Sequence, residues 1–395
     1  MEEIIVDENK FLASFGDRQL NLAEKYIQAK ELQNSIKTIS EISRLIKHPE
    51  RTIYSWLSDK RVPFPIRALN YLKSIRLIPL KVEDTQSFLL FTELSAFLFG
   101  DGHLMKHLGA FSLFGEKEDL ELIASLLFKQ YKIEPHLAIN SSESEIRKIK
   151  NRVLYRTYPK GGDYRLNVNS SPLARLLFLA GAPVGDKVSS STKVPDWVMN
   201  SDKEIKRAFL SVLFGNELQC PFIRAKNAFT SATFGLHKVE SKVNELIKFH
   251  EQVKSLLAEF GVTSSPIAGE KNRTLRKDGT LSQKISFYID GRSPNIVKLF
   301  QEIPFKYAEK KQAKFVKAVE TFLKNSSGLK KEWETYEKTI QLRSTGLSAD
   351  RILEKLRLPK NHIYKITGWI YYGRKPLYYD SREILEWGVV KISNL

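Results

Sequence analysis

Two apolar segments of the chain each end in a carboxylate, and this placement indicates chemistry. The first, Leu94–Leu104, reads LSAFLFGDGHL and carries Asp101, and the second, Phe209–Leu218, reads FLSVLFGNEL and carries Glu217. Both have the composition of buried helices. The C-terminus of a helix bears a partial negative charge, so an acidic side chain there is unfavourable unless a cation lies nearby. We therefore expect a bound cation at these two helix ends.

The expected cation is Mg²⁺ or another divalent metal ion, because carboxylate oxygens suit hard cations of this kind. Small residues recur four positions apart in each segment, at Ala96 and Gly100 in the first and at Ser211 and Gly215 in the second. Small side chains on one stripe let two helices approach closely. The two carboxylates would then converge on one metal centre. A metal ion there can activate water and stabilise a leaving oxygen, as phosphodiester hydrolysis requires.

The elements that position the two carboxylates form a repeat between residues 87 and 325. Tyr164–Phe178 (YRLNVNSSPLARLLF) and Ser286–Phe300 (SFYIDGRSPNIVKLF) each predict a strand, a Ser-Pro helix start and an amphipathic helix. Upstream of each, the pattern predicts an apolar helix, short strands and another helix. We expect two α/β units with antiparallel strands, a first half at 87–202 and a second half at 203–325.

The acidic segments carry a family resemblance. LSAFLFGDGHL resembles the LAGLIDADG motif of homing endonucleases, and RAFLSVLFGNEL resembles the second copy in single-chain members with two repeats. The resemblance extends from near Leu90 to near Phe322. It implies an α+β fold of two pseudo-symmetric αββαββα repeats, with the motif helices at their interface and saddle-shaped antiparallel sheets that bind DNA. It also implies that Asp101 and Glu217 bind the metal ion and are catalytic.

The second motif departs from the family pattern. Leu218 stands where a Gly is expected, and Gly215 stands where an earlier acidic residue is usual. If the shared Leu-Phe-Gly triplets are aligned, Asn216 falls opposite Asp101. The lead-in IKRAFL favours Glu217 instead.

The resemblance further implies a lysine near each scissile phosphate, where a cation stabilises developing charge or helps to activate water. In the first half, the segment GAPVGDKVSSSTKVPDW offers Lys187 as the first choice and Lys193 as the alternative. In the second half, the segment IPFKYAEKK offers Lys306 or Lys310.

The composition indicates a polyanionic partner. The chain has 63 Lys and Arg against 45 Asp and Glu, a formal charge of +18, which favours nucleic acid. Its one cysteine, Cys220, excludes an internal disulfide, and no zinc-binding pattern occurs. No uncharged apolar run is long enough to span a membrane. We expect a cytoplasmic protein with no membrane partner.

The two ends of the chain resemble each other. Residues 39–63 (ISEISRLIKHPERTIYSWLSDKRVP) and residues 347–376 (LSADRILEKLRLPKNHIYKITGWIYYGRKP) each predict a helix-turn-helix, with Ser40 or Ser348 as the cap of the first helix. We expect all-α helix-turn-helix domains at 1–86 and 326–395, whose second helices enter a major groove. The candidate DNA contacts there are Arg51, Thr52, Ser55, Lys60, Arg61, Asn361, His362, Lys365, Arg374 and Lys375.

Further candidate contacts lie on the predicted strands, and most would meet phosphates. They are Arg152, Arg156, Arg165, Arg224, Lys226, Arg273, Arg276 and Lys284. Together these features predict a site-specific, Mg²⁺-dependent endonuclease of homing-endonuclease type that hydrolyses double-stranded DNA, as a monomer with an internal pseudo-dimer. The altered second motif leaves an alternative open, a catalytically degenerate LAGLIDADG-type transcriptional regulator. RNA is a less favoured partner.

Overall fold

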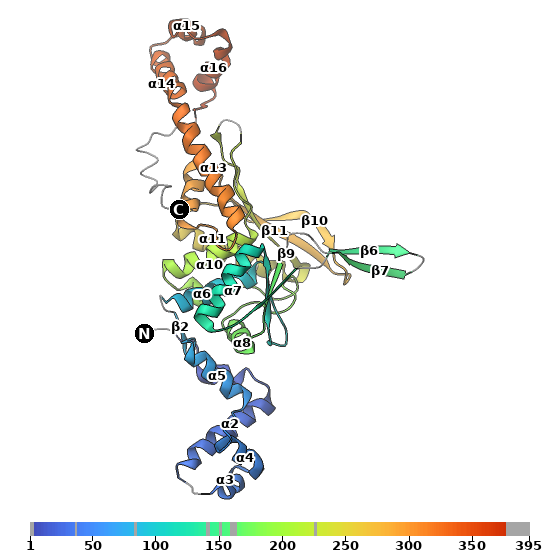
Figure 1. Ribbon diagram of the computed structural model, residues 1–395. Coiled ribbons are helices and arrows are strands. Elements are labelled where there is room, and N and C mark those ends of the chain that lie inside the picture. The colour runs from blue at the N-terminus through green and yellow to red at the C-terminus, as the bar shows by residue number, and fades with distance from the viewer. Residues whose placement is uncertain are drawn as a thin grey trace.

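The computed structural model describes residues 4–35, 38–82, 85–139, 143–149, 152–158, 164–224 and 227–376. Helices combine with antiparallel sheets throughout this part of the chain, which confirms the mixed helical and antiparallel character that the sequence predicts. The helices near the two ends of the chain lie at opposite sides of a central body that contains most of the strands (Figure 1).

Two buried helices run through the centre of the body. They are α6 (Gln86–Phe99) and α10 (Lys203–Glu217), and they pack against each other. Side-chain oxygens cap both N-termini: Thr85 accepts from the Phe88 amide at 3.2 Å, and Asp202 accepts from the Ile205 amide at 3.0 Å. The two capping residues therefore fix where the helices begin, and their length fixes where the acidic ends lie.

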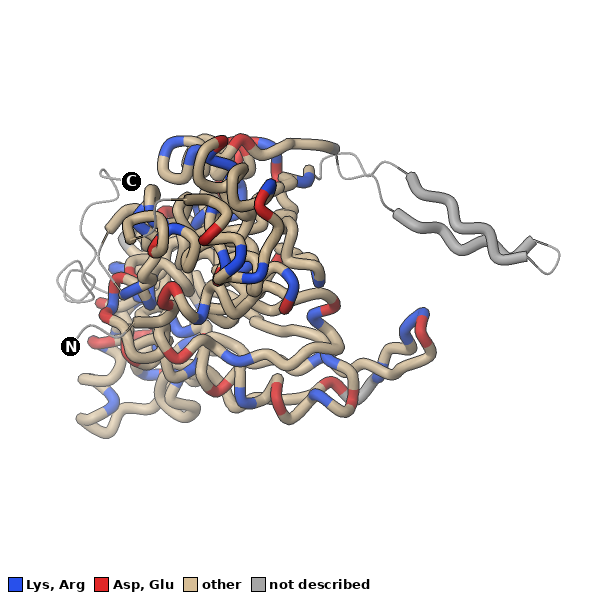
Figure 2. Tube along the Cα trace, turned by 90° about the horizontal axis from the view of Figure 1, so that it is seen from below, with Lys and Arg blue, Asp and Glu red and all other residues tan. Residues whose placement is uncertain are grey.

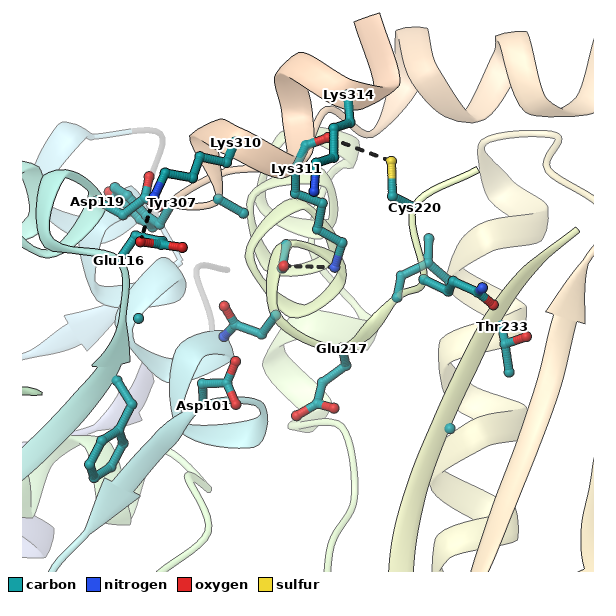
Figure 3. A pocket seen from close by; sticks show the side chains of 18 of the residues that line it. Asp101, Glu116, Asp119, Glu217, Cys220, Thr233, Tyr307, Lys310, Lys311 and Lys314 are labelled. Atoms are coloured by element: carbon teal, nitrogen blue, oxygen red, sulfur yellow. Dashed lines mark hydrogen bonds and ion pairs between the residues drawn. The ribbon is translucent and has the colours of Figure 1, made fainter. Parts of the chain in front are cut away.

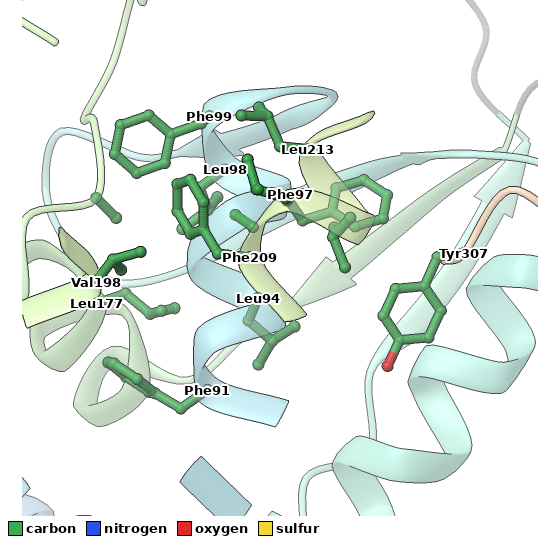
Figure 4. Close-up of a cluster of buried hydrophobic side chains, with 14 of the residues drawn as sticks. Phe91, Leu94, Phe97, Leu98, Phe99, Leu177, Val198, Phe209, Leu213 and Tyr307 are labelled. Atoms are coloured by element: carbon green, nitrogen blue, oxygen red, sulfur yellow. The ribbon is translucent and has the colours of Figure 1, made fainter. Parts of the chain in front are cut away.

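Aromatic and aliphatic side chains fill the space around these helices. The ring of Phe99 on α6 meets Phe209 on α10 edge-on, with centroids 5.6 Å apart, and stacks on Phe249. Phe97 and Leu213 belong to the same buried cluster (Figure 4). Because protein interiors are close-packed, such a cluster leaves little freedom for one helix to slide along the other.

The first half contributes a four-stranded antiparallel sheet with strand order β3-β4-β8-β5. Its residues alternate as in a half-buried sheet: Leu166 and Val168 on β8 are buried, Asn167 between them is partly buried, and Arg165 is exposed. Among the described residues, β6 and β7 form a separate two-stranded sheet. The elements are β3 (Gly102–Leu104), β4 (Phe111–Gly115), α7 (Lys117–Tyr131), β5 (His136–Ile139), β6 (Glu143–Ile149), β7 (Arg152–Tyr158), β8 (Tyr164–Val168), α8 (Ser171–Leu179) and α9 (Asp196–Met199).

The second half contributes a three-stranded antiparallel sheet with strand order β10-β11-β9. The turn between β10 and β11 contains Gly279 at φ +79°, a backbone conformation that favours glycine. The elements are β9 (Ala232–Val239), the 3₁₀ helix η2 (Glu240–Lys242), α11 (Val243–Glu259), β10 (Ala268–Leu275), β11 (Leu281–Ile289), α12 (Ser293–Glu302) and α13 (Glu309–Gly328).

The N-terminal segment divides between two hydrophobic cores. Phe11 and Leu72 join the core of the central body, whereas Ile53 and Trp56 belong to a separate small core around the predicted helix pair. The elements are β1 (Ile4–Val6), α1 (Glu8–Ala13), α2 (Asp17–Gln33), α3 (Ile39–Ile46), α4 (Glu50–Leu57), α5 (Phe64–Ser74) and β2 (Leu80–Lys81).

One predicted cap is wrong. Thr38, not Ser40, caps α3, because its hydroxyl accepts from the Glu41 amide while the Glu41 carboxylate accepts from that hydroxyl. Ser40 lies inside α3, and its hydroxyl donates to Glu50 at 2.6 Å. The helix therefore begins two residues earlier than a cap at Ser40 would place it.

The C-terminal segment forms the second predicted helix pair. Ser348 caps α15, as expected, by accepting from the Arg351 amide at 3.5 Å. Ile352, Ile366 and Trp369 form its small core. The elements are α14 (Lys330–Ser344), α15 (Ala349–Lys355), the 3₁₀ helix η3 (Lys360–His362) and α16 (Ile363–Tyr371). Among all the helices described, none has both the length and the apolar character that a membrane crossing needs.

Candidate functional site

The packing of α6 against α10 brings Asp101 and Glu217 to one place. Asp101 follows the last turn of α6, and Glu217 ends α10. Both line an open pocket of about 670 Å³, and their carboxylates project into the same space (Figure 3). Phe114 on β4 and Thr233 on β9 also line it, so the pocket has walls from both sheets.

Glycines explain how closely the chain segments approach here. A methyl group at Gly100 would lie 2.7 Å from the Asn216 Cβ atom, so the end of α6 rests directly on α10. This confirms the close approach expected at Gly100. Gly215 serves a different contact: a methyl group there would lie 2.5 Å from the carbonyl oxygen of Lys306. The small residue at 215 therefore makes room for the backbone of Lys306, in the second half, and not for α6.

The structure also shows how Asn216 and Glu217 differ. Asn216 lies against Gly100, and its buried amide nitrogen has no hydrogen-bond partner within the described parts of the chain. Glu217 instead projects into the pocket and interacts electrostatically with Asp101. Asn216 and Glu217 both line the pocket, but only Glu217 brings a second carboxylate close to Asp101.

The environment of Glu217 disfavours its negative charge. Burial, together with the nearby charge of Asp101, raises the pKa of Glu217 to about 7, although Lys187 and Lys311 act in the opposite direction. Two carboxylates forced together in a partly buried site cannot both ionise freely. A divalent cation between them would remove that penalty.

Lys187, the first-choice lysine, lies at this site. Its ammonium donates to the carbonyl oxygen of Gly100, at the C-terminus of α6. Burial lowers the pKa of Lys187, while the charges of Glu217 and Asp101 oppose that shift. The alternative, Lys193, is exposed and pairs with Asp196 at 2.7 Å instead.

A second lysine, Lys311 on α13, lies against the C-terminus of α10, and it was not among the candidates chosen from the sequence. The ammonium of Lys311 donates to the carbonyl oxygens of Phe214 and Gly215 at 2.9 and 2.8 Å. Burial lowers the pKa of Lys311 to about 8. The C-termini of α6 and α10 are thus each in contact with a lysine that neutralises their carbonyl groups.

The two lysines chosen from the sequence for the second half have carboxylate partners of their own, although Lys310 also lines the pocket that holds Asp101 and Glu217. Lys306 pairs with the buried Glu93 at 2.5 Å, and Lys310 pairs with Glu116 at 2.8 Å. Lys306, Lys310 and Lys311 lie within six residues of one another. Which of them reaches the end of α10 depends on the residue at which α13 begins. No local sequence signal distinguishes Lys311 from its neighbours.

The donor set at the pocket fits a hard cation. Asp101 and Glu217 supply carboxylate oxygens, and the pocket is open enough to admit water molecules that would complete the coordination, as Mg²⁺ prefers. Within the residues that the structure describes, no group of three or more His, Cys, Asp or Glu side chains forms a fuller protein cage. His103, next to Asp101 on β3, is exposed.

The candidate DNA contacts fall into three groups. Thr52, Ser55, His362, Arg276 and Lys284 are partly buried. Arg152 and Arg156 lie on β7, and Lys226 lies outside the described residues. The candidates with exposed side chains are Arg51, Lys60, Arg61, Arg165, Arg224, Arg273, Asn361, Lys365, Arg374 and Lys375.

Several of these cations already have acidic partners on the protein. Arg273 pairs with Glu240, Arg276 pairs with Asp186 at 2.6 Å, and Lys284 pairs with Glu270 at 3.1 Å. Figure 2 shows Lys and Arg spread along the whole described trace, with Asp and Glu between them. The sheet of the second half is therefore not simply a row of unpaired positive charges.

Comparison with known proteins gives only partial matches. No protein-family profile matches the chain. The chain is similar to the DNA-directed RNA polymerase subunit Rpo1N of Methanocaldococcus jannaschii, with 29% identity over 76% of this chain and 23% of the relative. The replication factor C small subunit of the same organism matches at 27% identity over 67% of this chain and 13% of the relative.

A third relative is the tRNA-splicing ligase RtcB of Methanopyrus kandleri, with 30% identity over 50% of this chain and 20% of the relative. The chain thus spans less than a quarter of the length of each of these three relatives.

Among solved structures, the homing endonuclease I-DmoI in complex with DNA and Mn matches with a TM-score of 0.32 and 14% identity, over 55% of this chain and 97% of that chain. Its complex with DNA and Ca matches with a TM-score of 0.31 and 14% identity, over 56% and 91%.

Proposed function

We propose that this chain is a divalent-metal-dependent endonuclease that hydrolyses phosphodiester bonds in double-stranded DNA. One observation carries the proposal: two helices pack so that Asp101 and Glu217 share one pocket, and a lysine, Lys187 or Lys311, lies at the end of each helix. The resemblance of segment 94–104 to the LAGLIDADG motif supports the same reading. In this proposal residues 87–325 form two pseudo-symmetric αββαββα repeats.

The residues of the site would share the chemistry as follows. Asp101 and Glu217 would hold Mg²⁺ or a similar ion, which supplies an activated water and charge stabilisation when bound. Lys187 and Lys311 would bind phosphate oxygens and stabilise the negative charge that develops on them. Both ammonium groups are partly buried, so their charges are screened less by water than those of surface lysines.

The names of the relatives do not transfer to this chain. They describe an RNA polymerase subunit, a replication factor subunit and a tRNA-splicing ligase, and each shares 23% or less of its length with this chain. A segment that recurs in proteins with such different names is expected to have a function of its own. This supports an activity that is independent of the three named ones.

The test is cleavage of a duplex DNA library of random sequence, with Mg²⁺ or Mn²⁺, by the wild type and by Asp101→Asn. We expect the wild type to cut a subset of sequences and Asp101→Asn to lose at least a hundredfold in rate. Glu251→Gln is the control, because it removes an exposed carboxylate from α11. Equal cleavage by Asp101→Asn and wild type would refute the metal-site assignment.

A second function, a DNA-binding regulator that does not cleave, is favoured by Leu218 in place of the expected Gly and by the ion pairs on the second sheet. Sequence-specific binding that is unaffected by metal ions, with no nicking of the selected DNA, would establish this alternative.

A further inference from the structure

The loop that carries Lys187 belongs to the first half but is held by the second half. Lys238 on β9 donates from one ammonium to three oxygens of that loop: the carbonyls of Lys187 and Ser190 and the hydroxyl of Thr192. Only 2% of Lys238 is exposed. A buried cation is costly to place unless it is hydrogen-bonded, and these three oxygens supply an acceptor for each donor of the ammonium.

Other contacts of the same loop also come from the second half. Arg276 pairs with Asp186 at 2.6 Å and donates to the Ser189 hydroxyl at 2.8 Å. The amide of Val239 donates to the Val188 carbonyl at 3.1 Å. Lys187 therefore sits in a loop that is held on both sides of it by side chains and backbone of the opposite half.

The reverse arrangement holds Lys311. The segment that leads into α13 belongs to the second half, and three carboxylates of the first half contact it. Glu93 on α6, only 4% exposed, accepts from Lys306 and from the Tyr307 hydroxyl, each at 2.5 Å. Asp119 on α7 accepts from the Glu309 amide at 3.0 Å, and Glu116 accepts from Lys310.

We infer that each half positions the lysine of the other: Lys238 is a positioning residue for Lys187, and Glu93 is a positioning residue for Lys311. The supports have opposite charge, since cations of the second half hold one lysine and carboxylates of the first half hold the other. The catalytic consequence rests on the proposed function, but the placement of the two lysines does not.

The placement is tested by acetylating the full-length protein with acetic anhydride and measuring each lysine by mass spectrometry. Lys238→Met should raise the labelling of Lys187 at least threefold and leave Lys311 unchanged, whereas Glu93→Gln should do the reverse. Exposed Lys193 is the internal reference. Lys248→Met and Glu251→Gln, exposed positions on α11, are the matched controls and should change neither. If both variants affect both lysines equally, or affect neither, the inference is wrong.

Two milder variants test the inference if the Lys238→Met protein does not fold. Arg276→Gln removes one support of the Lys187 loop from a partly exposed position and should raise Lys187 labelling by a smaller factor. Lys238→Arg keeps the cation and should restore part of the protection that Lys238→Met loses. An Arg276→Gln protein that is folded and labelled like the wild type would overturn the inference.

Cleavage then reports on the two lysines separately. The two strands of a duplex that the wild type cuts are labelled at different ends, so that the cleavage rate of each strand is measured separately. Lys238→Met should slow cleavage of one strand at least tenfold, and Glu93→Gln should slow cleavage of the other by the same factor. Equal slowing of both strands in both variants would refute reciprocal positioning. If the wild type cuts no DNA, the proposed function fails, and the acetylation result still decides whether the lysines are held as described.

Discussion

Replacing Glu217 by Gln should stabilise the metal-free protein at alkaline pH. The pKa of Glu217 is raised from 4.5 to about 7, mainly by burial and then by Asp101. The folded protein therefore binds this proton more tightly than the unfolded chain, so stability falls as the pH rises from 4.5 to 7 and stays low above 7. At about 1.4 kcal/mol per pH unit, the ionised carboxylate costs up to roughly 3 kcal/mol.

The assay compares thermal unfolding of the wild type and Glu217→Gln in EDTA at pH 8 and pH 5. At pH 8 the variant should unfold up to roughly 10 °C higher, from about 2–4 °C per kcal/mol for a body of this size. At pH 5 the difference should fall to less than a third of that. Mg²⁺ should raise the wild-type midpoint at pH 8 and leave the variant almost unchanged, since the ligand stabilises only the state that binds it.

The control is Glu251→Gln, which removes a carboxylate that is exposed on α11. It should shift the midpoint little and equally at both pH values. The reasoning fails if Glu217→Gln destabilises the protein at pH 8, or if its effect is the same at pH 5 and pH 8. Either result would mean that the Glu217 carboxylate is not held in a site that disfavours its charge.

Three further predictions concern single side chains. Gly100→Ala should lower the free energy of unfolding by about 1–3 kcal/mol in urea titration, because the new methyl group meets Asn216 at 2.7 Å, whereas Gly16→Ala, with no atom within 4 Å, should not. Lys311→Met should cost a similar amount, because it removes the ammonium that donates to two carbonyl oxygens at the end of α10, while the exposed Lys314→Met on the same helix as Lys311 should change little. Tyr364→Ala, at a side chain 83% exposed on α16, should weaken duplex DNA binding without changing stability by more than about 0.5 kcal/mol.

The parts of the site that the sequence predicted are local features. An apolar run that ends in Asp101 or Glu217 indicates both where a helix ends and which acidic side chain lies at its end. The two carboxylates can therefore be predicted from the sequence alone. The two helix pairs at the chain ends could also be predicted, because the spacing of apolar residues around Ile53 recurs around Ile363. Even the misplaced cap at Ser40 was displaced by only two residues.

The parts that the sequence did not predict depend on contacts across the chain. Lys306 reaches Glu93 over 213 positions, and that contact is what removes Lys306 from the list of candidate active-site lysines. Likewise, the acidic partners of Arg273 and Lys284 depend on how β9, β10 and β11 are paired. Charge and spacing in one segment do not encode which opposite charge another segment will bring to it.

The placement of the acids also changes how the net charge of +18 acts. Glu93 is paired with Lys306 and Asp186 with Arg276, so these two ion pairs contribute little net charge to the field outside the protein. The long-range field that draws a polyanion is instead set by exposed cations, such as Arg61 and Arg374 in the two helical ends. In the proposed function, attraction of DNA and positioning of the lysines are thus carried by different charges, and a substitution can impair one while sparing the other.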